Sequence, residues 1–116
     1  MLRKIDNYTF VCNSRNTRSG FAHDCTLYKN DWEIENTSCH YLNRTWECYQ
    51  YQTVMLKTIR KVMETIENNC LFEFKRQNGY NKMTEKRKEE FVKYLETNEE
   101  YEELNKVYDE LRKSHC

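Results

Sequence analysis

The sequence predicts an α+β fold, in which a three-stranded antiparallel β-meander packs on an α-helix and is followed by a helical C-terminal extension. Two patterns indicate this. From Ile5 to about Leu42, β-branched and aromatic residues alternate with polar ones, which is typical of strands. After Asn43, apolar residues recur at three- and four-residue steps, which is typical of an amphipathic helix. We expect residues 1–80 to form the sheet and helix and residues 81–116 to form the helical extension of the same structural unit.

Three strands are expected in the first part of the chain, over residues 5–12, 21–29 and 32–42. A polar loop over residues 13–20, which ends at one of the two glycines, separates the first two strands. Asn30-Asp31 forms a two-residue turn between the second and the third strand.

The Asn30-Asp31 turn also fixes an expected register for the second and third strands. Leu27 opposes Ile34, and Cys39 opposes Ala22. The polar run over residues 36–38 is expected to mark a β-bulge or bend.

A long helix is expected from residue 46 to 68, and the same spacing allows it to continue to Asn78-Gly79. Thr84 marks a second helix start, and the capping box Thr97-x-x-Glu100 marks a third. A helical hairpin and a single kinked helix over residues 84–113 both fit this pattern. The extension either packs on the sheet, reaches out alone, or dimerises through a seam of Tyr101, Leu104, Tyr108 and Leu111.

The distribution of charge is uneven although the net charge of the 116 residues is zero. Residues 51–88 hold nine basic and four acidic side chains, and residues 89–116 hold four basic and nine acidic ones. A basic segment is therefore followed by an acidic one, a dipolar arrangement that suits two kinds of partner. No run of residues is apolar enough to span a membrane, so no membrane partner is expected and the chain is expected to be intracellular.

The sequence contains no recognisable catalytic motif, so we expect a non-enzymatic protein without a cofactor. Two glycines are too few for a phosphate-binding loop. His23, Asp24 and Cys25 adjoin one another, but successive residues of a strand point to opposite faces and cannot act as a catalytic pair. We expect His23 to be a hydrogen-bonded strand histidine. His23, Cys25, Cys39 and His40 lack the spacing of a zinc site, so no metal is expected and the cysteines are interpreted as free thiols.

Two regions are candidate binding surfaces. At the junction of strand and helix, Arg44 and Trp46 lie among several tyrosines, a composition found in binding hot spots. Arg15 and Arg18 lie in the 13–20 loop and are further candidates. The second surface is the acidic C-terminal helix, whose carboxylates suit a basic groove. They are Glu96, Glu99, Glu100, Glu102, Glu103, Asp109 and Glu110.

A nucleic-acid interface is the alternative interpretation. Its phosphate contacts would come from basic side chains of the sheet, the junction and the second helix start. They are Arg15, Arg18, Arg44, Lys82, Lys86, Arg87 and Lys88.

Two stretches, GFAHDCTLY (residues 20–28) and CHYLNRTWECYQYQTVM (residues 39–55), resemble those of small proteins carried by phages, plasmids and conjugative elements of low-GC Gram-positive bacteria. The resemblance covers about residues 5–66, and its most specific part is the run from Asn43 to Glu47. This family has no assigned activity, so the resemblance supplies no catalytic residue.

The resemblance implies a function in the cytoplasm of a bacterial host. Small proteins of such elements often inhibit host defence, and anti-CRISPR proteins are among them. The leading hypothesis is therefore a DNA-mimicking inhibitor that occupies the nucleic-acid groove of a CRISPR-Cas effector nuclease or of its guide complex. The alternative is a small nucleic-acid-binding accessory protein of the element.

Overall fold

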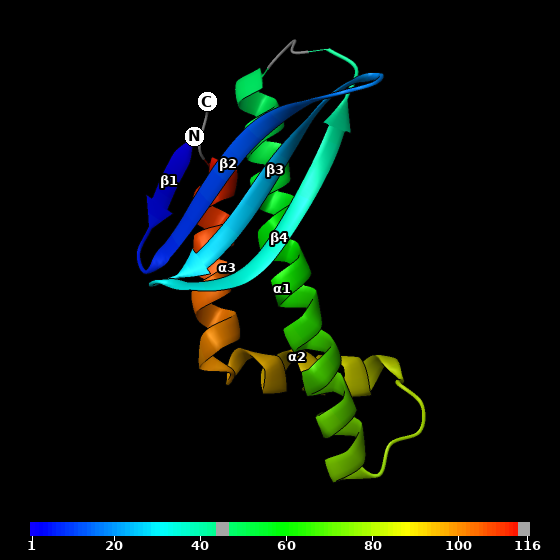
Figure 1. Cartoon of the computed structure of the whole chain (residues 1–116). Coiled ribbons are helices and arrows are strands. Elements are labelled where there is room, and N and C mark those ends of the chain that lie inside the picture. Colours follow the sequence, from blue (N-terminus) through cyan, green and yellow to red (C-terminus); the bar gives the residue numbers. More distant parts are fainter. Residues whose placement is uncertain (44–46, 114–116) are drawn as a thin grey trace.

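The computed structural model describes residues 1–43 and 47–113 of the chain. Its elements are β1 (Leu2–Ile5), β2 (Tyr8–Thr17), β3 (Gly20–Lys29), β4 (Trp32–Tyr41), α1 (Glu47–Asn78), α2 (Glu85–Glu96) and α3 (Glu99–Lys113) (Figure 1). The strands form one antiparallel sheet in the order β1-β2-β3-β4. The α+β class is confirmed, but the prediction of three strands is wrong, since the described residues form four.

The additional strand is β1, which pairs with β2 from Leu2 opposite Val11 to Ile5 opposite Tyr8. Asp6 and Asn7 form the turn between these strands, and Asp6 has a positive φ of 53°. Asp tolerates this conformation better than most residues because its short side chain can hydrogen-bond locally. Leu2 and Ile5 are the only apolar residues of β1 and lie three positions apart, so no alternation marks it as a strand in the sequence.

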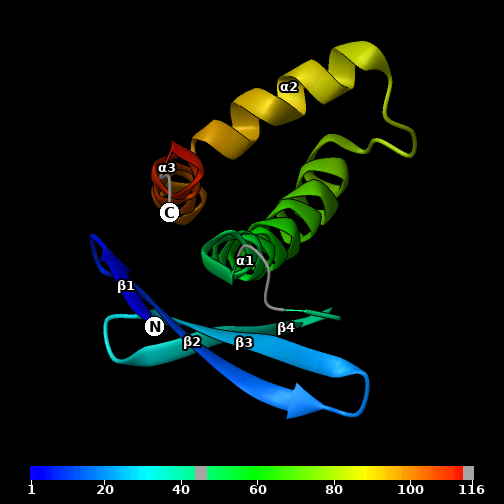
Figure 2. The ribbon, with the colours of Figure 1, turned by 90° about the horizontal axis from the view of Figure 1, so that it is seen from above.

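The expected polar loop over residues 13–20 is also wrong. β2 continues to Thr17, and a turn of Arg18 and Ser19 leads directly into β3. The helices cover only one face of the sheet, so the other face is open to solvent (Figure 2). Polar residues such as Asn13 and Arg15 belong to this open face, as is usual in antiparallel sheets.

A β-bulge changes the register of β3 and β4. Leu27 opposes Glu35 and Tyr28 opposes Glu33, which leaves Ile34 as the extra residue. The bulge therefore lies two residues before the predicted one, and Leu27 does not oppose Ile34. Beyond the bulge, Cys39 opposes His23 instead of Ala22.

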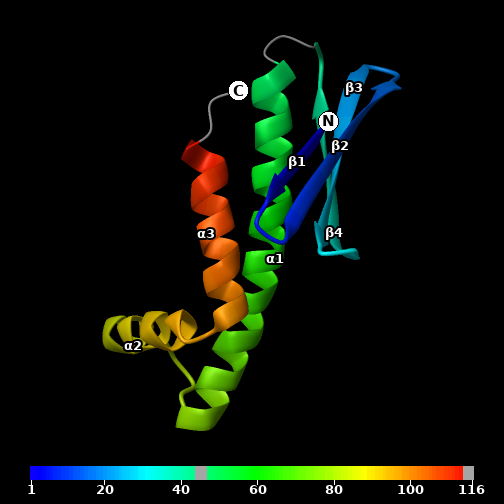
Figure 3. The same cartoon turned by 90° about the vertical axis from the view of Figure 1, so that its left-hand side faces the viewer.

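α1 lies along the covered face of the sheet, and α3 runs back beside it, as two perpendicular views show (Figures 2 and 3). The side chains of both helices join those of β2 and β3 in one core. α1 extends beyond the sheet, and α2 crosses this distal part. The core consists of Tyr8, Phe10, Cys12, Cys25, Leu27, Val54, Met55, Ile59, Met63, Leu104, Val107 and Leu111.

The end of α1 agrees with the longer of the two predicted helices. Gly79 has φ of 65°, and its N–H and that of Tyr80 donate to the carbonyls of Arg76 and Lys75, at N···O distances of 3.4 and 2.9 Å. These two bonds form a Schellman motif, which satisfies carbonyls at the helix end.

α2 and α3 are separate helices joined by a sharp bend, and they form neither a hairpin with each other nor one kinked helix. Thr84 is the N-cap of α2, as predicted. Thr97, however, is the C-cap of α2, and the α3 N-terminus is capped by Asn98, whose Oδ1 accepts from the N–H of Tyr101 at 2.9 Å. The expected capping box is therefore wrong by one residue.

The expected dimer seam lies against the chain's own core. Leu104 and Leu111 are fully buried, and Tyr101 and Tyr108 pack at the edge of the core. This face of α3 is therefore occupied within the monomer.

Two lysines of α1 reach the edge strand β4. Lys57 Nζ donates to the carbonyl of Ser38 at 2.7 Å, and Lys61 Nζ lies 3.6 Å from the carboxylate of Glu35. The helix thereby supplies a hydrogen-bond donor to one backbone carbonyl of the edge strand, that of Ser38.

Within the described residues, no helix combines the length and the apolar character required to cross a membrane.

Alanine substitutions at the two glycines are expected to have unequal effects. Gly20 and Gly79 both have a positive φ, which strains an L side chain. An added methyl group meets no atom within 4 Å at Gly79, but at Gly20 it collides with the backbone carbonyl oxygen of Tyr41. We expect Gly79→Ala to lower the free energy of unfolding by about 1 kcal/mol. Gly20→Ala should lower the free energy of unfolding by a further ~1–3 kcal/mol, because the added methyl group overpacks its surroundings. Urea denaturation measures both, and equal losses would contradict the argument.

Candidate functional site

The bend between α2 and α3 gathers acidic side chains. Five of the eight residues from 96 to 103 are Glu, and no Lys or Arg occurs from residue 94 to 105. We call this segment the acidic corner, and it comprises Glu96, Glu99, Glu100, Glu102 and Glu103. The Asn98 cap fixes where α3 begins and therefore how these carboxylates are oriented.

Glu103 differs from the other residues of the acidic corner because it binds to the sheet. Its carboxylate accepts from the hydroxyl of Tyr8 at 3.2 Å and lies 3.4 Å from Lys29 Nζ. Burial of the Tyr8 hydroxyl and the negative charge of Glu103 raise the pKa of Tyr8 well above its usual range. Glu103 therefore anchors α3 to the sheet, a role that the sequence did not indicate.

Glu96 and Glu102 line a pocket of about 470 Å³ where α1, α2 and α3 meet. The remaining lining residues are Glu67, Val92, Leu95, Tyr101 and Asn105. No pocket at this place was predicted from the sequence. A usable signal was Glu67 itself, because it lies four residues after Met63 in the apolar row of α1 and so faces other elements.

One wall of this pocket is fixed by a hydrogen bond between helices. The Tyr101 hydroxyl donates to Glu67 Oε1 at 2.5 Å, and Arg60 Nη1 lies 3.6 Å from the same oxygen. Burial and the Glu67 carboxylate raise the pKa of Tyr101 to about 12, so its hydroxyl stays protonated at neutral pH. The Glu67 carboxylate is thus already bound by two side chains of the protein itself.

The last two predicted acidic contacts, Asp109 and Glu110, are exposed and lie farther along α3. Lys106, Arg112 and Lys113 are interspersed with them. The acidic character of α3 is therefore concentrated at its N-terminal half.

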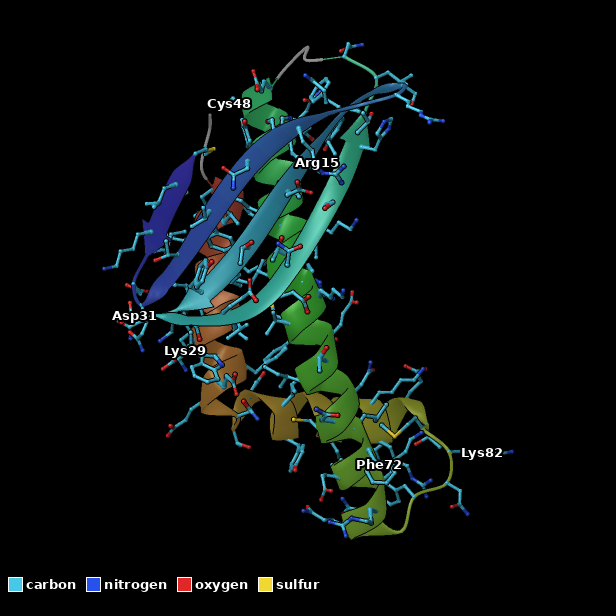
Figure 4. The ribbon with its side chains drawn as sticks, in the orientation of Figure 1. Arg15, Lys29, Asp31, Cys48, Phe72 and Lys82 are labelled. Atoms are coloured by element: carbon cyan, nitrogen blue, oxygen red, sulfur yellow. The ribbon has the colours of Figure 1, made fainter. Side chains whose placement is uncertain are left out.

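The predicted basic contacts are not brought together. Arg15 lies on the sheet and Lys82 lies in the connection between α1 and α2, at opposite ends of the molecule (Figure 4). Arg15 Nε is 3.0 Å from the Asp24 carboxylate, and Arg18 occupies the exposed β2–β3 turn. The two predicted contacts at the junction, Arg44 and Trp46, lie outside the described residues.

The basic residues near the start of α2 also have structural roles. The Arg87 guanidinium lies 4.0 Å from the centre of the Tyr80 ring and donates to the carbonyl of Lys82 at 2.8 Å. Lys88 Nζ lies 3.3 Å from Glu85, and Lys86 is exposed. Of these residues, Arg87 is the one whose contacts join α2 to the connection between α1 and α2.

A hydrogen-bonded network surrounds the buried His23. Nε2 lies 2.9 Å from Oε1 of Gln50, and Nδ1 lies 2.6 Å from the Ser14 hydroxyl. Because the Gln50 oxygen only accepts, Nε2 carries the proton and Nδ1 accepts from Ser14. Ser14 Oγ is also 2.7 Å from the hydroxyl of Tyr51, and the Gln50 amide donates to the carbonyl of Asn43 at 3.0 Å.

This network confirms that His23 is a hydrogen-bonded strand histidine. A serine next to a histidine is also found in hydrolases, but there a carboxylate stabilises the imidazolium that forms during the reaction. Here the group on the other side of the ring is the neutral amide of Gln50. The network thus joins β2, β3 and α1 structurally.

Cys12, Cys25, Cys39 and Cys70 have free thiols, as expected, whereas Cys48 is disulfide-bonded. Cys12 and Cys25 oppose each other in β2 and β3 and are buried. The hydrogen bond between them and their burial raise the pKa of Cys12. Over residues 1–43 and 47–113, no three His, Cys, Asp or Glu side chains are grouped to hold a metal ion.

Comparison of the chain with protein-family models, with curated proteins and with solved structures found no match in any of the three.

Substitution of Gln50 by Met should destabilise the protein, because it leaves the buried N–H of His23 without this acceptor. We expect the free energy of unfolding to fall by about 1–3 kcal/mol. The control is Gln77→Met, an exposed position on the same helix, which should change it by less than about 0.5 kcal/mol. Chemical denaturation measures both variants. Equal effects would show that the hydrogen bond to His23 is dispensable.

Acid should remove the contribution of Asp24 to stability. Hydrogen bonds from the Ser38 hydroxyl and from Arg15 hold the pKa of Asp24 below its usual range. The unfolded chain therefore binds the proton first, so this contribution is present above the ordinary Asp pKa and is lost as pH falls through the folded pKa. Wild type should be more stable than Asp24→Asn at neutral pH, and the two should converge toward about pH 2. A difference that stays constant in urea denaturation at each pH would refute this.

Proposed function

We propose that this protein is a non-enzymatic inhibitor that binds a bacterial defence factor, most concretely a CRISPR-Cas effector nuclease, and blocks its nucleic-acid groove. The observation that supports this most directly is the acidic corner, where Glu99, Glu100 and Glu102 share the first turn of α3 and the first two are exposed. Such a target would place the protein in the cytoplasm of a bacterial host.

The physical basis is charge mimicry. A groove that binds nucleic acid concentrates Arg and Lys side chains, which attract any complementary array of carboxylates. The N-terminal half of α3 offers such an array on a rigid helix, whose orientation is fixed by the anchor of Glu103 to Tyr8 and Lys29. A preorganised array loses less conformational entropy on binding than a flexible acidic tail would.

The nucleic-acid alternative receives less support from the geometry. Arg15 and Lys82 lie at opposite ends of the molecule, and the Arg15 guanidinium is paired with Asp24. Nonspecific affinity for nucleic acid depends on the number of phosphates that one surface neutralises, and the net charge of the chain is zero.

The proposal is tested by adding the purified protein to CRISPR effector nucleases loaded with guide RNA and measuring cleavage of target DNA. We expect inhibition of an effector at stoichiometric concentration. The variant Glu99→Lys/Glu100→Lys should lose inhibition by roughly tenfold or more, because it reverses charges that face the groove. The matched control Glu33→Lys/Glu89→Lys reverses two exposed carboxylates elsewhere and should retain inhibition.

Two results would count against this function. Equal inhibition by both variants would exclude the acidic corner as the binding surface. No inhibition of any effector, together with a salt-sensitive mobility shift of duplex DNA, would favour the nucleic-acid-binding alternative, since DNA affinity falls steeply with ionic strength.

A further inference from the structure

The pocket at the acidic corner combines apolar walls with two unengaged carboxylates. Val92 and Leu95 of α2 and Tyr101 of α3 line it, and Val92 is 55% exposed although it is aliphatic. Glu96 and Glu102 stand at the same pocket, which has a volume of about 470 Å³. The bend between α2 and α3 is tied to α1 by the Tyr101 hydroxyl, which donates to Glu67, and by Asn98 Nδ2, which lies 3.6 Å from Cys70 Sγ.

The charges of this pocket are unbalanced. Glu67 is engaged by the Tyr101 hydroxyl and by Arg60. Among the described ion pairs and side-chain hydrogen bonds, neither the Glu96 carboxylate nor the Glu102 carboxylate has a partner. The pocket therefore presents two carboxylates beside an apolar surface, and the complementary occupant is a cation with an apolar stem.

We propose that this pocket binds an arginine side chain of the protein partner. The inference rests on the proposed function and adds the chemistry that the partner must present. Arginine suits the pocket better than lysine, because its planar guanidinium donates to two carboxylates at once and stacks on an aromatic ring such as that of Tyr101. Its methylene groups would cover Val92 and Leu95, which water now contacts.

The test uses fluorescein-labelled hexa-arginine and hexa-lysine peptides, which carry equal charge, and measures binding by fluorescence anisotropy at physiological salt. The pocket variant is Glu96→Gln/Glu102→Gln. The matched control is Glu33→Gln/Glu89→Gln, which removes two exposed carboxylates that belong neither to the pocket nor to the acidic corner.

We expect hexa-arginine to bind more tightly than hexa-lysine, and the pocket variant to weaken hexa-arginine binding roughly 10- to 100-fold, as the loss of charge-assisted hydrogen bonds implies. The control should weaken it by no more than about twofold, the loss expected for solvent-exposed charges. In NMR titrations the largest amide shifts should occur at Val92, Leu95 and Asn105.

Three results would overturn the proposal. Equal weakening by both variants would mean that a diffuse acidic field, not the pocket, attracts the peptide. Equal affinity for the two peptides would remove the preference for arginine. Absence of hexa-arginine binding would exclude the site.

Failure of this inference is distinguishable from failure of the proposed function. If Glu96→Gln/Glu102→Gln still inhibits the effector nuclease while Glu99→Lys/Glu100→Lys does not, the function stands and the pocket is not the contact.

Discussion

The packing of α1 against one face of the sheet is the constraint on which the rest of the structure depends. Val54, Met55, Ile59 and Met63 form the row of α1 that is buried in the core. A sheet with one covered face and one open face needs a helix of this kind, since an isolated antiparallel sheet of this size leaves its apolar side chains in water. α3 completes the cover, and its position in turn fixes the acidic corner.

Polar contacts determine how α1 lies on the sheet. The hydroxyls of Thr37 and Thr58 are 2.6 Å apart in the buried interface, and His23 contacts Gln50, about two turns earlier along α1. Apolar packing tolerates small rotations and slides, whereas a buried polar pair loses its partner if the helix moves. These pairs therefore select one orientation of α1. The Gln50 side chain also donates to the backbone carbonyl of Asn43, which follows β4.

Much of the fold was predictable because periodicity reflects burial. The strand and helix types follow from the alternation before Leu42 and the helical row after Asn43. The errors arise where local pattern and tertiary contact differ. β1 has four residues and no alternation of apolar and polar side chains, so only its pairing with β2 defines it as a strand. The bulge at Ile34 is set by pairing with β3, which no local pattern reveals.

The candidate site was predictable only in part, for the same reason. The acidic residues were visible as a run of sequence, but the hydrogen bond that distinguishes Glu103 joins it to Tyr8, 95 residues away along the chain. The pocket needs three helices, and although the spacing of Glu67 from Met63 places it in the buried row of α1, the sequence alone does not show which residues of α2 and α3 face it.

The contacts of Lys57 and Lys61 with β4 bear on the concentration at which the protein remains monomeric. An edge strand offers unpaired backbone groups to strands of other molecules, and lysines near such an edge oppose that association. The Ser38 carbonyl and the Glu35 carboxylate of this edge are already engaged by the helix, so this edge is less able to pair with a strand of another copy as the protein concentration rises.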